Sequence, residues 1–168
     1  MNLKTKVFVL EVNNLSDARY CASMGVDTIA FTLTGEKCIS KEEVLAMSQW
    51  VSGVNIGLEI ESLDEDTAQF IEENNIAVII STNPEILKKY NDKTTILKGS
   101  ENNMFTYSYS NSLNNVPSLI VDAPKVKDLE SYLAKENVKG LVLKGGEEER
   151  PGYKTFDELA DTLEALEN

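Results

Sequence analysis

Apolar and polar positions along this chain follow two periodicities that alternate. Short apolar runs, typical of buried strands, take turns with stretches in which apolar residues recur every three or four positions, as on one face of a helix. This alternation predicts an α/β protein in which a mostly parallel sheet is covered by helices. The strand-like runs are residues 7–12, 27–33, 55–61, 77–81, 95–98, 104–110, 118–121 and 140–143.

The helical stretches have recognisable first residues. Ser40 is followed three positions later by Glu43, which predicts a capping box and a helix that extends to Val51. Asn14 opens an earlier helix with Cys21 on its apolar side, so we expect this thiol to pack in the core. In the last helix, apolar residues three and four positions apart predict packing against the sheet.

The alternation breaks between residues 99 and 117. Parallel neighbours need a crossover of about a dozen residues or more, but only five residues separate Lys98 from Met104, and seven separate Ser110 from Ser118. We therefore expect helices to be missing here. Residues 1–168 then form a single domain, a TIM-type (β/α) barrel of seven or eight mostly parallel strands that is trimmed or partly open on this side.

Charge and composition narrow the possible functions. The formal net charge of −12 argues against nucleic acid and membrane as partners, because both attract a basic surface. No stretch is typical of an export signal or a membrane span, so we expect a cytoplasmic protein with reduced thiols at Cys21 and Cys38. The lack of histidine excludes a Ser-His-Asp triad and His-ligated zinc, and we expect neither a metal site nor a cofactor.

Segments near both ends of the chain resemble one family. The stretches NNLSDARYCASMGVDTIAF (residues 13–31), CISKEEV (38–44) and KGGEEERPGYKTFDEL (144–159) are similar to motifs of phosphoribosylanthranilate isomerase, the barrel enzyme of tryptophan biosynthesis. The likeness covers most of the chain except roughly residues 99–116. It implies the isomerase barrel and a sugar phosphate as ligand, and we also expect a homodimer.

The proton-transfer residues of that family are not matched. Its first strand ends in a cysteine that is the general base of an Amadori rearrangement, and the corresponding positions here are Leu10 and Glu11. A leucine side chain cannot accept a proton. The general-acid aspartate of the family ends its sixth strand, whereas residues 104–110 contain no carboxylate. The sequence therefore predicts a barrel that lacks the isomerase chemistry.

The family's phosphate-binding positions are only partly matched. An arginine of the family corresponds to Lys37, which keeps the charge but not the two-pronged guanidinium. A glycine pair corresponds to Asp122 and Ala123, and an aspartate there would repel phosphate. In the last loop, Lys144 is followed by Gly145 and Gly146 and then by three glutamates.

Three uses of the strand ends stay open. Lys144, Gly145 and Gly146 either hold an anion or simply form a tight strand-to-helix turn, which we favour. Carboxylates at strand ends either form a cluster suited to Mg²⁺ or Ca²⁺, or they are solvated rim charges or partners of Lys98 and Lys144. We favour rim charges or lysine pairs over the cluster. The aromatic run either covers the gap in the barrel or forms a self-association surface. The carboxylates are Glu11, Glu61 and Asp122, and the aromatic run holds Met104, Phe105, Tyr107 and Tyr109.

These observations favour a protein with the isomerase barrel, no isomerase activity, and a role in binding or structure. Its candidate ligand is a small phosphorylated metabolite held by Lys37, Lys144, Gly145 and Gly146. The alternative is an active sugar-phosphate isomerase with displaced catalytic residues. In that alternative Glu11 is the base and Asp122 the acid.

Overall fold

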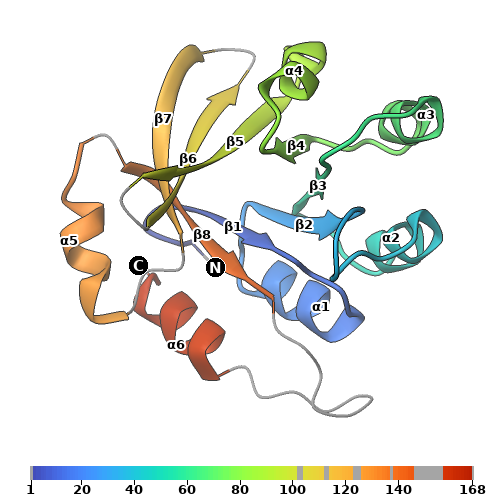
Figure 1. The fold of residues 1–168 in the computed structure, drawn as a ribbon. Coiled ribbons are helices and arrows are strands. Elements are labelled where there is room, and N and C mark those ends of the chain that lie inside the picture. Colours follow the sequence, from blue (N-terminus) through green and yellow to red (C-terminus); the bar gives the residue numbers. More distant parts are fainter. Residues whose placement is uncertain are drawn as a thin grey trace.

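The structure is a closed eight-stranded barrel. The computed structural model describes residues 2–101, 104–111, 114–122, 126–136, 138–145 and 157–167. Within them the strands neighbour one another in chain order and β8 pairs with β1 (Figure 1). The strands are β1 (Lys6–Leu10), β2 (Thr28–Thr32), β3 (Asn55–Glu59), β4 (Val78–Ser81), β5 (Thr94–Glu101), β6 (Met104–Asn111), β7 (Asn114–Asp122) and β8 (Val138–Lys144).

Helices follow most of the parallel strands and lie outside the barrel (Figure 1). The predicted capping box is present: Ser40 accepts a hydrogen bond from the Glu43 amide, and Glu43 accepts one from the Ser40 amide. Asn14 and Asp64 cap two other helices through their side chains. The helices are α1 (Leu15–Ser23), α2 (Lys41–Ser48), α3 (Glu65–Glu73), α4 (Pro84–Leu87), α5 (Leu129–Leu133) and α6 (Asp157–Ala165), with 3₁₀ turns at Lys88–Tyr90 and Val126–Asp128.

Strand β6 is the trimmed side of the barrel. It pairs antiparallel with β5 and with β7, and the described residues contain no helix between these strands. The connections are too short for a parallel crossover, so the chain turns back twice. Two reversals restore the direction, and β7 therefore pairs parallel with β8. The prediction of missing helices is confirmed, and since the ladder closes, the barrel is trimmed rather than partly open.

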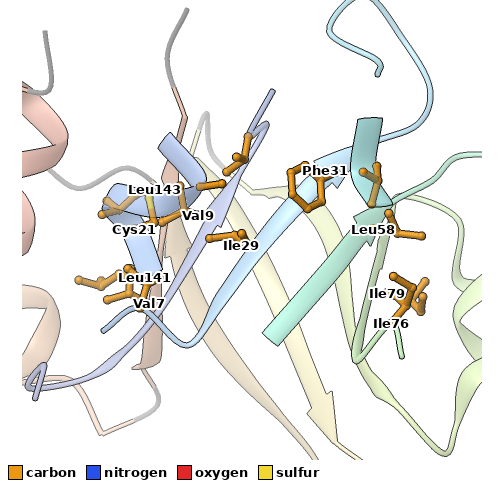
Figure 2. Close-up of a cluster of buried hydrophobic side chains, with 14 of the residues drawn as sticks. Val7, Val9, Cys21, Ile29, Phe31, Leu58, Ile76, Ile79, Leu141 and Leu143 are labelled. Atoms are coloured by element: carbon orange, nitrogen blue, oxygen red, sulfur yellow. The ribbon is translucent and has the colours of Figure 1, made fainter. Parts of the chain in front are cut away.

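Alternating residues of the strands build two apolar cores. Val7 and Val9 of β1 face outward and pack in an apolar layer under the helices. This layer also contains the buried Cys21 (Figure 2). The core position expected for Cys21 is thus confirmed. Phe8 and Leu10, which alternate with Val7 and Val9 along β1, face the barrel interior. The interior cluster consists of Phe8, Leu10, Ala30, Val78, Ile80, Ile96 and Val142.

The two ends of the described chain meet beside the barrel. The Lys4 amide donates to the carbonyl of Leu166 over 2.9 Å, and Leu3 forms an isolated antiparallel bridge with Glu167. Leu163 and Leu166 of the last helical segment are fully buried, as their spacing predicts. None of the helices in the described part of the chain is long and apolar enough to cross a membrane.

Candidate site at the mouth of the barrel

The carboxyl ends of the parallel strands form the mouth of the barrel, where β/α barrels carry their sites. Leu10, the last residue of β1, is only 1% exposed there. It belongs to the same interior cluster as Ile80, Ile96 and Val142. An aliphatic side chain therefore ends β1 at the mouth of the barrel.

Glu11 follows Leu10 and has an unusual backbone. Its φ angle of 56° lies in the left-handed region, which is uncommon for residues other than glycine. Hydrogen bonds fix the backbone on both sides of it. The Gly145 amide donates to the Leu10 carbonyl over 2.7 Å, and the Val12 amide donates to the Ala30 carbonyl over 3.1 Å. The surrounding structure thus determines this conformation.

The Glu11 carboxylate lies between two lysines. The Lys37 ammonium, in the loop after β2, donates to its Oε2 over 3.1 Å. The Lys144 Nζ, at the end of β8, is 3.8 Å from its Oε1. The Glu11 side chain is 21% exposed, against 46% for Lys37 and 40% for Lys144. Glu11, Lys37 and Lys144, singled out separately in the sequence, therefore meet in one ionic group.

The close approach of neighbouring atoms requires a glycine at position 145. A Cβ atom built on it would lie 2.9 Å from the Glu11 carbonyl oxygen and 3.0 Å from Oδ2 of Asp17. Asp17 is fully buried in the first turn of α1, and Asn14 donates to its carboxylate over 3.2 Å. This packing alone accounts for a glycine at position 145. Gly146 lies outside the described residues.

A second ionic group lies deeper in the mouth. Glu59, the last residue of β3, is 6% exposed and forms an ion pair with Lys98 of β5. The Thr32 hydroxyl donates to Glu59 over 3.4 Å. From the sequence, Lys98 was a candidate partner for strand-end carboxylates, but the burial of Glu59 was not predicted. The signal was present, because Lys98 follows Ile96 by two positions, and alternate residues of a strand share a face.

The carboxylates do not gather into a metal site in the part of the chain that is described. Glu61, beyond the end of β3, is exposed and accepts hydrogen bonds from the amide and hydroxyl of Thr82. Glu11 is held by the two lysines instead. Asp122 ends β7 in register with Val142, and its side chain lies outside what is described. Among the described residues, no three carboxylate or thiol groups could hold a metal ion together.

The reversal of β6 moves its carboxyl end away from the mouth. Because β6 runs antiparallel to its neighbours, Asn111 at its carboxyl end lies at the opposite rim. The carboxyl end of β6 is therefore not part of this mouth. The side chains of the aromatic residues Phe105, Tyr107 and Tyr109 lie outside what is described.

A hollow of about 360 Å³ lies beside the mouth, between the first turns of α2 and α3. Its polar lining includes Asp64, which caps α3. Hydrogen bonds from Thr67 lower the pKa of the Asp64 carboxyl, so the group stabilises the helix start. Hydrogen bonds from Ser40 likewise lower the pKa of Glu43 at the start of α2. Both carboxylates therefore act as helix-capping groups.

Comparison with solved structures identifies the architecture. The barrel superposes on phosphoribosylanthranilate isomerase from Thermus thermophilus with a TM-score of 0.67 and 19% sequence identity, covering 96% of this chain and 98% of that one. Monomers generated from the dimeric isomerase of Thermotoga maritima match with a TM-score of 0.68, 13% identity and the same two coverages. The chain has the fold of phosphoribosylanthranilate isomerase.

A third isomerase structure adds a ligand. It is a complex with reduced 1-(o-carboxyphenylamino)-1-deoxyribulose 5-phosphate and matches with a TM-score of 0.63 and 15% identity, again over 96% of this chain and 98% of that one. No protein-family model matches the sequence, and no curated protein does so. The likeness to phosphoribosylanthranilate isomerase is therefore one of fold, and the chemistry of this chain must be argued from its own residues.

Proposed function

We propose that this chain is a binding protein built on the phosphoribosylanthranilate isomerase barrel, and that it does not catalyse the Amadori isomerisation. The observation that carries the proposal is the position of Leu10, which is buried in the barrel interior at the end of β1. An aldose-to-ketose isomerisation needs a base that removes a proton from carbon. A leucine cannot do this, and loss of a positioned general base lowers a rate by roughly a hundredfold to ten-thousandfold.

The neighbouring groups support the same conclusion. Glu11 carries a carboxylate, but this carboxylate forms ion pairs with Lys37 and Lys144. Glu59 is paired with Lys98 inside the mouth. The reversal of β6 also removes the strand end that carries the acid in the resembled family.

The ligand that we propose is a small phosphorylated metabolite. One similar isomerase structure holds a deoxyribulose 5-phosphate derivative, and Lys37 and Lys144 place two ammonium groups at the mouth of this barrel. Ammonium groups at a strand end are suited to a phosphate dianion. We also propose self-association as a homodimer, supported by the dimeric Thermotoga maritima isomerase, and a cytoplasmic location with both thiols reduced.

A coupled assay of phosphoribosylanthranilate turnover tests the proposed inactivity. We expect no turnover above the blank, with the Thermus thermophilus isomerase as positive control. Turnover that is lost in both Glu11→Gln and Asp122→Asn would instead establish the alternative, an active isomerase that uses Glu11 as base and Asp122 as acid. Sedimentation velocity on the same sample measures the oligomeric state, and a monomer at micromolar concentration would contradict the dimer.

A further inference from the structure

Glu11 connects two parts of the mouth that the chain brings together from distant positions. Its carboxylate contacts Lys37 from the loop after β2 and Lys144 from the end of β8. Two ammonium groups that face one another are a common way to hold a bound anion. Here the anion between Lys37 and Lys144 is the side-chain carboxylate of Glu11.

The backbone holds this carboxylate in place at a conformational cost. A glutamate at φ 56° has its Cβ in a disfavoured position. The conformation persists because the hydrogen bonds of Gly145 and Val12 fix both neighbouring peptides. Gly145 also packs so closely on the Glu11 carbonyl that a Cβ at residue 145 would lie 2.9 Å from it. A surface ion pair formed by chance needs none of these features.

We propose that Glu11 is a built-in occupant of an anion site formed by Lys37 and Lys144, and that a phosphate-bearing ligand binds there only when this carboxylate is displaced. The inference rests on the proposed function, because it concerns the same site. It adds a regulatory element, since Glu11 competes with the ligand. At 21% exposure the carboxylate is accessible at the mouth, so displacement requires movement of one side chain and no opening of the barrel.

Removal of the Glu11 charge tests the competition. We would titrate inorganic phosphate, at constant ionic strength, into wild type, Glu11→Gln and Glu61→Gln by calorimetry. Glu61 is the matched control, because it is an exposed carboxylate near the mouth that hydrogen-bonds Thr82 instead of a lysine. Both variants change the net charge equally. We expect about tenfold tighter binding, equal to about 1.4 kcal/mol, in Glu11→Gln alone, and loss of that gain in Glu11→Gln/Lys144→Gln.

The outcomes separate this inference from the proposed function. Equal affinities of Glu11→Gln and Glu61→Gln overturn the inference, and so does wild-type binding as tight as that of Glu11→Gln. The second result leaves the proposed binding role intact. Isomerase turnover by wild type refutes the proposed inactivity without bearing on the competition. Glu11→Gly, which adopts the left-handed backbone without strain, repeats the test if Glu11→Gln unfolds.

Discussion

Glu59 and Lys98, which are 39 residues apart in the sequence, form an ion pair inside the mouth of the barrel. Glu59 ends β3 and Lys98 lies on β5, so the pair reaches across β4, the strand between them. The side chain of Glu59 is 8% exposed and that of Lys98 is 22% exposed. Because a buried charge without a partner is strongly unfavourable, each of the two charges offsets the cost of burying the other.

Breaking this pair on one side should destabilise the barrel. Lys98→Met leaves the Glu59 carboxylate buried without its counterion, and we expect a loss of about 3 kcal/mol in the free energy of unfolding. The double variant Glu59→Leu/Lys98→Met should lose less than Lys98→Met alone, because no charge is left buried. Urea denaturation of wild type and of these variants measures the free energies of unfolding.

The exposed pair of Lys88 and Glu85 is the matched control for that experiment. Their side chains are 69% and 71% exposed, so Lys88→Met should change the free energy of unfolding by less than about 0.5 kcal/mol. If the loss in Glu59→Leu/Lys98→Met equals the sum of the losses in Glu59→Leu and in Lys98→Met, the two charges of the buried pair do not depend on each other.

Gly145→Ala should be destabilising because of the close approach of the Glu11 carbonyl and Asp17. Overpacking of this kind costs about 1–3 kcal/mol. Gly35→Asn is the control: Gly35 has a φ of 94° but no atom within 4 Å of a Cβ built there, and asparagine tolerates positive φ better than most residues. If both substitutions have the same effect in urea denaturation, the close packing around residue 145 does not account for its glycine.

Leu10→Ala should leave a cavity in the barrel interior. Substitutions of this type cost about 2–5 kcal/mol when the site is fully buried, and Leu10 is 1% exposed. Trp50→Ala removes a larger side chain that is 67% exposed, and we expect it to change stability by no more than about 0.5 kcal/mol. Comparable losses in thermal unfolding would contradict the placement of Leu10.

The carboxyl of Glu43 should titrate below its ordinary pKa of 4.5, because the Ser40 amide and hydroxyl donate hydrogen bonds to its charged form. A carboxyl whose folded pKa is lowered stabilises the fold above its unfolded pKa, and this contribution is lost as the pH falls through the folded pKa. NMR titration of the side-chain carboxyl carbon measures the value. In Ser40→Ala, which removes the hydroxyl but keeps the backbone amide, the pKa should rise only part of the way towards 4.5, and an unchanged value would exclude the hydroxyl as a cause.

The antiparallel direction of β6 can be tested by NMR spectroscopy. Antiparallel strands bring the α-carbons of non-hydrogen-bonded pairs to about 4.5 Å, which places their α-protons in contact. We therefore expect inter-strand α-proton contacts among the pairs of Ile96 with Tyr109 and Leu97 with Ser108. No such contacts should appear between β3 and β4, whose residues Leu58 and Ile79 pair in parallel. Their absence along β5 and β6 would contradict the antiparallel pairing of these two strands.

Much of the architecture follows from local features of the sequence. Ser40 and Glu43 form their capping box from contacts within one turn, so neighbouring residues suffice to predict it. The short connections after Lys98 and Ser110 exclude two crossover helices by chain length alone. The alternation in β1 similarly separates the outward Val9 from the inward Leu10.

The pairing of charges and the closure of the barrel depended on tertiary structure. Glu11 contacts lysines 26 and 133 residues away, and no local pattern reports which charges the folded strands bring together. The sequence predicted a trimmed or partly open barrel, and only the pairing of β6 with both of its neighbours decided between the two. Local hydrogen bonds and chain length are properties of adjacent residues, whereas ion pairs and ladder closure arise from strands that meet only in the folded chain.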